Sequence, residues 1–324
     1  MSEFITIGEP LVVLCSTQLN KSIADSTNFN RVVGGAELNV AIGVSRLGHS
    51  AEYISQVGND PQGEFIQNQI NTKKINTQYL RKTNKYLTGY QMKQLVSHGD
   101  PKVYNFRKNS AATHINLNFV DKINLSDIKV AHLTGILPAI SKEAKESSFY
   151  LAQKFNLKKI ILTFDPNLRP ALWKNKTEMI KTINALAEYA DIVLPGLSEG
   201  KILTGSDNPE EICDFYLKNR QTKAVFVKVG AKGSYVKLKE KKQGTFVPGF
   251  KVKKVVDTVG AGDGFALGVI TALLEGKNHL QAARRGNAIG AMQVQTHGDN
   301  DGYPTRKELA EFYRKMELEN YAFI

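Results

Sequence analysis

The stretch that decides the fold reads Asp257-Thr258-Val259-Gly260-Ala261-Gly262-Asp263-Gly264-Phe265. An apolar run continues to Leu274 and predicts a helix that begins within the stretch. Glycines directly before a helix leave backbone N–H groups uncovered, and such groups form an anion site. A carboxylate in the first helical turn, here Asp263, would lie at the edge of that site and could accept a proton from a hydroxyl. The pattern therefore suits transfer of a phosphoryl group to a hydroxyl.

Other patterns could produce the same residues. A plain helix start, with glycines for the turn and Asp263 as a partner of the helix dipole, is the default for an isolated Gly-x-Gly. A dinucleotide fingerprint fails, because its third glycine position holds Phe265 and no acid closes a strand about 20 residues later. The pattern GxxxxGK[ST] occurs nowhere in the chain, which excludes a P-loop enzyme.

The complete nonapeptide resembles the C-terminal signature D-T-x-G-A-G-D-x-F of the ribokinase-like (phosphofructokinase-B type) sugar kinases. The segment from Gly34 to Ala41 is similar to their N-terminal signature G-G-A-x-x-N-x-A, although alone it could be a tight turn before a helix. Two signatures in the right order imply a resemblance over nearly the whole chain. It makes Asp263 the catalytic base. The implied anion-hole and sugar-contact residues are Gly260, Ala261, Gly262, Gly34, Gly35 and Asn39.

Further segments match nucleotide and metal motifs of this family. The run Asp165-Pro166-Asn167-Leu168-Arg169 follows an expected strand, at the edge where open α/β sheets bind ligands, but is otherwise an ordinary Asp-Pro turn. The run from Lys228 to Gly233 matches K-x-G-x-x-G, which a hairpin turn would also explain. Glu199 keeps the acid of the N-x-x-E magnesium motif, whose Asn position holds Gly196, so magnesium would be held through water. The resemblance implies ATP and Mg²⁺, with a monovalent cation as a further option, and nucleotide contacts from Asn167, Arg169, Lys228, Gly230, Gly233, Gly260, Gly262 and Asn287.

The composition of the 324 residues, 42% hydrophobic and 23% charged, is that of an ordinary globular protein. No apolar run reaches membrane-spanning length and the first residues lack a basic segment, so neither an anchor nor a signal peptide is expected. Cys15 and Cys213 form no disulfide framework or metal spacing, which fits a cytoplasmic protein. The net charge of +12 comes from scattered lysines, which argues against nucleic acid, and the densest patch, Lys237 to Lys242, is expected at a solvated hairpin tip.

From about residue 129 onward, short apolar runs alternate with helical patterns, which predicts a parallel sheet covered on both faces. The expected strands there are 130–133, 160–164, 192–194 and 225–229, and the expected helices are 142–155, 178–189 and 209–217. The first third should hold strands 11–14, 89–96 and 102–106, the last two joined by a turn at 97–101, and helices 36–47 and 61–72. We therefore expect one domain over residues 1–324 with a small β insertion.

The resemblance implies the same α/β fold: a ribokinase-like three-layer α/β/α sandwich with a mostly parallel sheet and a small β-sheet lid. The lid strands would come from roughly residues 11–35 and 86–108. In this family such a lid covers the sugar and often pairs two subunits, so a homo-oligomer is expected.

The expected lid also carries the clue to the substrate. Its run Tyr104-Asn105-Phe106-Arg107, with Ser110-Ala111-Ala112, is similar to that of 2-keto-3-deoxygluconate kinases, as is the D-P-N-x-R-x-x-x-W run ending at Trp173. A sugar acid needs a cation, and Arg107 could meet a carboxylate with two parallel hydrogen bonds, although an exposed Arg also protects an edge strand. The implied substrate contacts are Gly34, Gly35, Asn39, Tyr90, Tyr104, Phe106, Arg107, Arg169, Asp263 and Asp299.

The sequence therefore predicts an ATP-dependent kinase that phosphorylates the terminal hydroxyl of 2-keto-3-deoxygluconate, giving 2-keto-3-deoxy-6-phosphogluconate. A fructokinase, or another neutral-sugar or nucleoside kinase, is the alternative within the family. A catalytically inactive sugar-binding regulator is the alternative from another class, although the intact Asp263 and its glycines argue against it. The expected partners are the small sugar acid and ATP, with neither nucleic acid nor a membrane.

Overall fold

The structure, a computed structural model, describes residues 2–98 and 101–321. Within them, the larger sheet has nine strands in the order β13-β12-β11-β10-β9-β8-β1-β4-β5. Neighbours are parallel from β5 to β11, and β12 and β13 extend that edge as antiparallel strands. The strands are β1 Phe4–Ile7, β4 Ala51–Gly58, β5 Leu80–Thr83, β8 Val130–Thr134, β9 Ile161–Asp165, β10 Ile192–Val193, β11 Ala224–Lys228, β12 Gly233–Leu238 and β13 Thr245–Pro248.

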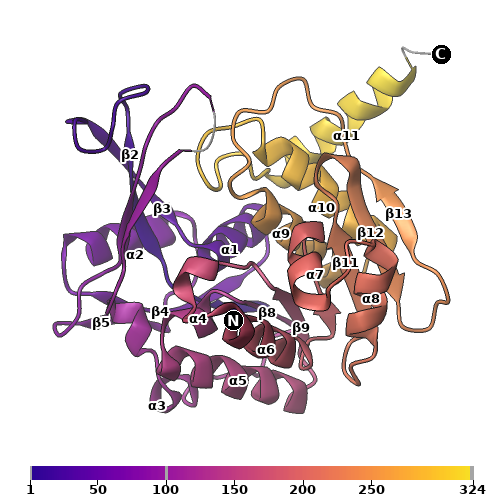
Figure 1. Cartoon of the computed structure of the whole chain (residues 1–324), viewed down its shortest axis with the longest axis horizontal. Coiled ribbons are helices and arrows are strands. Elements are labelled where there is room, and N and C mark those ends of the chain that lie inside the picture. Colours follow the sequence, from indigo (N-terminus) through magenta and orange to yellow (C-terminus); the bar gives the residue numbers. More distant parts are fainter. Residues whose placement is uncertain (1, 99–100, 322–324) are drawn as a thin grey trace.

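Helices cover both faces of this sheet (Figure 1), which confirms the predicted α/β fold class. Strand β11 illustrates why both faces are covered: Phe226 packs into one hydrophobic cluster and Val225 into the other. Successive side chains of a strand point to opposite faces, so a strand that is apolar throughout needs a layer on each side. The helices are α1 Ala36–Arg46, α2 Pro61–Thr72, α3 Leu117–Val120, α4 Leu137–Ile140, α5 Lys142–Leu157, α6 Lys176–Ala187, α7 Leu197–Thr204, α8 Pro209–Leu217, α9 Ala261–Leu274, α10 His279–Gln293 and α11 Arg306–Tyr321.

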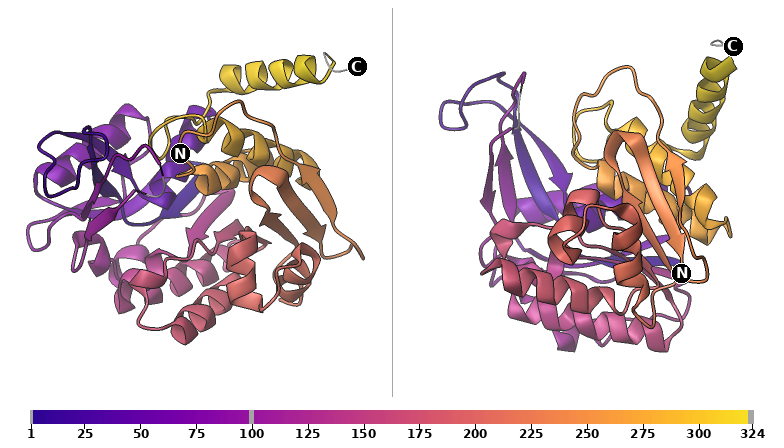
Figure 2. Two further views of the ribbon diagram at one scale, coloured as in Figure 1. Left: turned by 45° about the horizontal axis from the view of Figure 1, so that its top comes forward. Right: turned by 45° about the vertical axis from the view of Figure 1, so that its right-hand side comes forward.

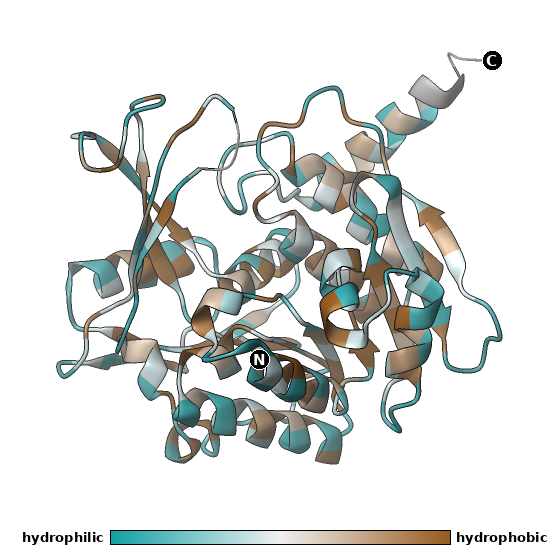
Figure 3. Cartoon of the chain, in the orientation of Figure 1, coloured by the Kyte–Doolittle hydropathy of each residue, from teal (hydrophilic) through white to brown (hydrophobic). Residues whose placement is uncertain are grey.

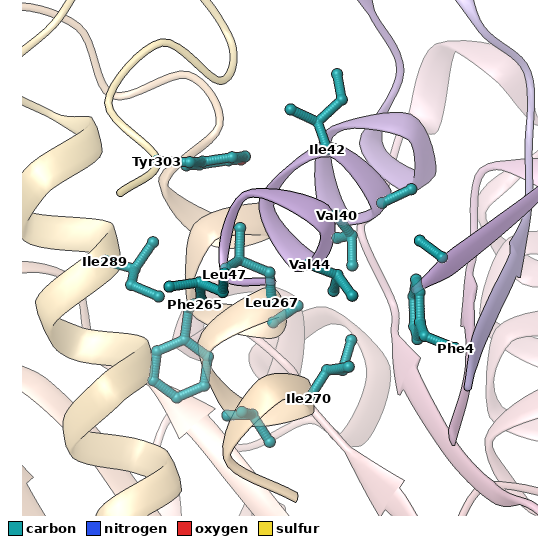
Figure 4. Close-up of a cluster of buried hydrophobic side chains, with 14 of the residues drawn as sticks. Phe4, Val40, Ile42, Val44, Leu47, Phe265, Leu267, Ile270, Ile289 and Tyr303 are labelled. Atoms are coloured by element: carbon teal, nitrogen blue, oxygen red, sulfur yellow. The ribbon is translucent and has the colours of Figure 1, made fainter. Parts of the chain in front are cut away.

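Helices α1 and α9 pack closely in the first of these clusters, where Figure 4 shows Val40 and Val44 of α1 near Leu267 of α9. Gly43 permits the close approach, since a Cβ there would lie 2.1 Å from Leu267 Cδ2. Each buried Val or Leu side chain contributes about 1.5–3 kcal/mol relative to leaving it exposed. This packing matters for function, because α1 and α9 are the helices that begin in the two signature segments.

Four further strands form a separate sheet in the order β3-β2-β6-β7, which we call the lid. They are β2 Leu11–Ser16, β3 Phe29–Gly34, β6 Tyr90–Lys93 and β7 Val103–Phe106. Figure 2 shows these strands, in indigo and purple, standing away from the body of the molecule in its right-hand view. Strands β6 and β7 pair antiparallel as expected of a hairpin, while Gly99 and Asp100 of the expected turn lie outside the described residues.

The prediction for the lysine-rich patch is wrong at its first residue. Lys237 belongs to β12 and is buried, with its ammonium paired to Glu210 and, at 2.5 Å, to Asp214 on α8. The strand continues through residue 238, so only the later lysines lie in the turn before β13. Figure 3 shows hydrophilic residues on the outer helices and in the loops as well as in this turn. Among the described residues, no helix has the length and apolar character that a membrane span requires.

Candidate active site

Helix α9 begins at a backbone position that only glycine fits. Gly260, its N-cap, has a φ of 77° in the left-handed region, and a Cβ there would lie 1.9 Å from the carbonyl oxygen of Asp299. Ala261 and Gly262 follow as the first helical residues, whose N–H groups have no partner within the helix. The N–H of Ala261 lies 3.3 Å from the carbonyl oxygen of Thr258. Such a helix start is typical of anion sites, and the anion site stays a prediction.

Asp263 lies in the first turn of α9 and faces the same region. Its Oδ2 accepts a hydrogen bond of 2.9 Å from Asn39 Nδ2, and its Oδ1 accepts one of 3.2 Å from Asn167 Nδ2. Burial raises the pKa of Asp263 to about 7, with the nearby Asp165 adding to the rise and Asn39 opposing it. A carboxylate that is half deprotonated near neutral pH is suited to act as a general base.

The two asparagines reach Asp263 from distant parts of the chain. Helix α1 starts directly after the Gly34-Gly35 pair, and Asn39 lies about one turn into it. Its Oδ1 accepts a 2.8 Å hydrogen bond from Asn300. Asn167 follows β9 with a φ of 40°, a conformation that asparagine tolerates better than most residues. Both expected residues are thus brought to the candidate base. Asn300, which the sequence analysis missed, fixes the orientation of Asn39.

Asp263, Asn39 and Asn167 line a cavity of about 610 Å³ between the lid and the carboxyl edge of the sheet. Most of the expected substrate and catalytic residues line it. Gly34 lies beside it, since a Cβ there would be 3.0 Å from Asp299 Oδ2. The expected residues that line it are Gly35, Asn39, Arg107, Asn167, Arg169, Glu199, Lys228, Gly260, Gly262, Asp263 and Asp299.

A second, largely apolar cavity of about 290 Å³ adjoins the first and shares Lys228, Thr258 and Gly262 with it. Gly230 and Gly233 lie in its wall, and apolar side chains such as Phe250 and Val255 complete it. Such a slot suits a flat aromatic base, with Gly262 at the junction of the two cavities. Asn287 lines this cavity too, but its Nδ2 donates to the carbonyl oxygens of Val247 and Pro248 at 3.0 and 3.1 Å, so it also holds β13 against α10.

Lys228 lies at that junction with its ammonium 2.7 Å from Asp165. Burial alone would lower the pKa of Lys228, but Asp165 and the carboxylates of Glu199 and Asp263 more than offset it, so the pKa is raised. The ammonium therefore stays charged where the two cavities meet, and could stabilise an anionic group there.

Arg107 is held by a carboxylate that the sequence analysis missed. Its guanidinium donates to Glu9 Oε2, with a distance of 2.7 Å from Nε, while Ser110 Oγ donates to Glu9 Oε1 at 2.5 Å. Glu9 is only 2% exposed, so this is a nearly desolvated ion pair at the cavity wall. In the sequence, the only sign of this role is that Glu9 is an acid inside the largely apolar stretch from residue 4 to 14. The pair fixes the direction of Arg107 and offsets its charge.

Arg169 differs from Arg107, because no carboxylate among the described residues pairs with it. Its Nη1 donates to the carbonyl oxygen of Leu168 at 3.0 Å, and the side chain lines the cavity. Its charge lowers the pKa of Asp263 without overcoming the effect of burial. Arg169 is therefore available to an anionic ligand.

Glu199 lies in the first turn of α7, and both of its carboxylate oxygens accept hydrogen bonds from backbone N–H groups. Oε1 accepts from the N–H of Leu168 at 2.8 Å, and Oε2 from the N–H of Gly196 at 2.7 Å. Within the described ranges, no group of three or more His, Cys, Asp or Glu side chains could hold a metal ion. Magnesium keeps several waters and often takes only one or two carboxylates beside substrate phosphates, so Glu199 fits a contact through water.

The structure does not bring Tyr90, Tyr104 and Phe106 to the cavity, which corrects the expectation for these residues. They point to the outer face of the lid, where the rings of Tyr90 and Phe106 stack with centroids 4.7 Å apart. The reason is the alternation of side chains along a strand. The residues of β6 and β7 that face the cavity are Gln91, Lys93, Val103 and Asn105, with Arg107 directly after β7.

Comparisons with known proteins find similar sequences over nearly the whole chain. A model of the pfkB family carbohydrate kinases matches residues 1–306. The 2-dehydro-3-deoxygluconokinase of Bacillus subtilis is 40% identical over 309 residues, which cover 95% of this chain and 94% of the relative. The 5-dehydro-2-deoxygluconokinase 1 of Bacillus cereus is 28% identical over 323 residues, covering 97% and 96%.

Solved structures give the same result for the fold. The PfkB protein from Polaromonas sp. JS666 superposes with a TM-score of 0.87 at 37% identity, covering 96% of this chain and 99% of that one. A fructokinase double mutant from Vibrio cholerae, with fructose, ADP and potassium bound, has a TM-score of 0.82 at 25% identity, covering 96% and 98%. A putative ribokinase II from E. coli in complex with ATP and Mg²⁺ has a TM-score of 0.88 at 24% identity, covering 97% and 100%.

Proposed function

Because the chain belongs to the pfkB family of carbohydrate kinases, we propose that it transfers the γ-phosphoryl group of ATP to the terminal hydroxyl of 2-keto-3-deoxygluconate. The product would be 2-keto-3-deoxy-6-phosphogluconate. The observation that carries the chemistry is Asp263, buried between Asn39 and Asn167 at the start of α9. The similarity to the Bacillus subtilis 2-dehydro-3-deoxygluconokinase supports the substrate.

The proposed reaction uses groups at the larger cavity, chiefly Asp263, Lys228 and the start of α9. Asp263 accepts the proton of the substrate hydroxyl as its oxygen bonds to the γ-phosphorus, and the bond from that phosphorus to the ADP oxygen breaks. The N–H groups at the start of α9 and the ammonium of Lys228 offset the charge on the phosphoryl oxygens. Because Asp263 lies beside these donors, the hydroxyl oxygen that loses its proton and the phosphoryl group that it attacks would lie next to each other.

The substrate carboxylate would lie at the opposite end of the larger cavity from Asp263. Arg169 has no carboxylate partner among the described residues and its charge acts on Asp263, so we assign it a place between the substrate and the phosphates. Arg107, oriented by Glu9, supplies directed N–H groups. Gly34, Gly35 and Asp299 lie nearer the start of α9, where the backbone of Asp299 approaches Gly260, and they complete the substrate site in the proposal.

ATP would place its base in the apolar cavity and its phosphates across the junction at Gly262. Magnesium, when bound, would offset charge on the nucleotide phosphates, and Glu199 would orient it through water. We extend the proposal to a monovalent cation, because the Vibrio cholerae fructokinase was solved with potassium. Replacing potassium by choline at constant ionic strength tests that extension.

We also propose that the enzyme acts in the cytoplasm as a homo-oligomer assembled through the lid. Tyr104 and Phe106 are each 48% exposed on the outer face of the lid, where a second copy could cover them. Cys15 and Cys213 are free thiols, in keeping with a reducing compartment.

One observation favours a neutral sugar as the second candidate substrate. The charge of Arg107 is already offset by Glu9, so Arg107 adds no net positive charge to the cavity. A fructokinase would need hydroxyl partners rather than a free cation, and the Vibrio cholerae fructokinase has a similar fold. Arg107 still offers directed N–H groups that match a carboxylate, which keeps the sugar acid as the first candidate.

The deciding experiment couples ADP release to a spectroscopic readout for 2-keto-3-deoxygluconate, 5-dehydro-2-deoxygluconate, fructose and ribose. The proposal expects the highest kcat/KM for 2-keto-3-deoxygluconate. A preference for fructose would overturn the substrate while leaving a kinase. Absence of turnover with every sugar would instead support the inactive sugar-binding regulator.

A further inference from the structure

The inner face of the lid carries two side-chain amides that no other described residue engages by a hydrogen bond. Gln91 on β6 and Asn105 on β7 are register partners in the antiparallel ladder, so their side chains are neighbours on one face. Both line the larger cavity. Neither amide is hydrogen-bonded to another described residue, whereas the two cations on the same face, Lys93 and Arg107, are held by carboxylates.

An unused amide pair is suited to hydroxyl groups, since each amide offers donors and an acceptor without charge. In the proposed reaction, the carboxylate of the substrate is anchored at one end and the accepting hydroxyl faces Asp263 at the other. The C4 and C5 hydroxyls of 2-keto-3-deoxygluconate lie between these ends. They need partners once the cavity excludes water, because leaving a buried polar group unpaired is costly.

We propose that Gln91 and Asn105 bind the hydroxyls in the middle of the substrate and determine which sugar acid is accepted. The identity of the substrate rests on the proposed function, while the choice of residues rests on the cavity and the strand register. The C4 epimer, 2-keto-3-deoxygalactonate, would direct one hydroxyl away from this pair. A site built to hydrogen-bond a hydroxyl discriminates against ligands that cannot pair with it.

The test uses Gln91→Met and Asn105→Leu, singly and together, because these side chains keep similar volume and lose the hydrogen bonds. Each single variant should lower kcat/KM for 2-keto-3-deoxygluconate about three- to tenfold, mainly through KM. The KM for ATP should not change. The double variant should no longer distinguish the substrate from its C4 epimer. Met92→Leu, one residue along β6 on the outer face, is the matched control and should behave as wild type.

A folded double variant, with wild-type thermal unfolding, that keeps both kcat/KM and the preference between epimers would overturn this inference. Preference of the wild-type enzyme for a neutral sugar would overturn the proposed function instead. The same variants then decide the role of the amides on that sugar: a loss of about three- to tenfold in kcat/KM supports it, and no loss overturns it.

Discussion

The carboxyl edge of the main sheet and the lid face each other across one cavity, yet they hold their functional groups differently. At the sheet edge, Asp263 is buried and bonded by two asparagines from separate elements. In the lid, Gln91 and Asn105 line the cavity from a half-buried strand, β6, and an exposed one, β7. In the proposed reaction, the packed edge supplies the chemistry and the lid supplies contacts to the substrate. Substitutions at the edge should therefore abolish turnover, and substitutions in the lid should change the choice of substrate.

The largest effect is expected for Asp263→Asn, which keeps the shape of the side chain but cannot accept a proton. Because general-base catalysis contributes about 10²- to 10⁴-fold, kcat should fall at least about a hundredfold. ATP should still bind, as measured by fluorescence titration or calorimetry. Turnover close to wild type would show that the base lies elsewhere and would remove the chemical distinction between the two regions.

The second effect concerns Arg107→Ala, which leaves the Glu9 carboxylate buried without its partner. In the proposal Arg107 also meets the substrate carboxylate. Losing one partner of such a desolvated pair typically costs about 2–5 kcal/mol, so kcat/KM for the sugar acid should fall about thirtyfold or more. KM should account for most of the loss, with a smaller effect on any neutral sugar that the enzyme accepts.

Glu9→Gln is the companion variant, because it keeps an acceptor for Arg107 and Ser110 but removes the charge. It should also raise KM for the sugar acid, by less than Arg107→Ala, if Glu9 only orients the arginine. If Glu9→Gln lowers KM, the carboxylate repels the substrate, and the neutral-sugar alternative gains support. An unchanged ratio of kcat/KM between 2-keto-3-deoxygluconate and fructose in Arg107→Ala would end the sugar-acid assignment.

The third effect follows from the raised pKa of Asp263, about 7 in the free protein. The base acts only when deprotonated, so kcat/KM should be half-maximal near pH 7 and level off about one pH unit above it. At one pH unit below that pKa, about a tenth of the carboxyl groups are ionised, so kcat/KM should be roughly tenfold lower. A kcat/KM profile that is flat from pH 5 to 8 would contradict either the burial of Asp263 or its role.

The two regions also differ in how well the sequence predicted them. At the sheet edge, Asp263 and Asn39 were found because each belongs to a local pattern at a helix start. Glu9 and Asn300 were missed, because their roles come from tertiary contacts that no local pattern encodes. In the main sheet, β4 was missed for a related reason. It is buried throughout but includes polar residues such as Gln56, whose Nε2 donates to the carbonyl oxygen of Ala111 at 2.9 Å.

The four lid strands lie within the expected ranges 11–35 and 86–108. The sequence motifs did not predict on which side of the sheet each side chain lies. Had Arg107 been taken as facing the cavity, the alternation along the chain would have placed Asn105 beside it and Tyr104 and Phe106 on the other face. The resemblance led to the tyrosines, because it gave residue types without the direction of each side chain. Local sequence patterns therefore predicted the packed edge better than the two-sided lid.

A smaller effect is expected for Glu199→Gln. The neutral amide can still accept one backbone hydrogen bond but no longer attracts a cation, so the magnesium concentration for half-maximal rate should rise a few-fold. A magnesium titration at saturating ATP measures it, and Glu211→Gln on the surface of α8 is the control. If the two variants titrate like wild type, Glu199 serves only to cap α7 and to hold the backbone at Leu168.

The smallest effect on turnover is expected for Tyr104→Ser, on the outer face of the lid. Because Tyr104 is 48% exposed and does not line the cavity, KM for the sugar acid should stay within about twofold, as for surface substitutions in general. The variant should instead shift the oligomer toward monomer in sedimentation or light scattering, since an aromatic side chain buried between two lids would be lost. A rise in KM comparable to that of Arg107→Ala, with no change in assembly, would mean that the lid turns its outer face to the substrate. The strict division between an inner face that selects the substrate and an outer face that joins subunits would then have to be given up.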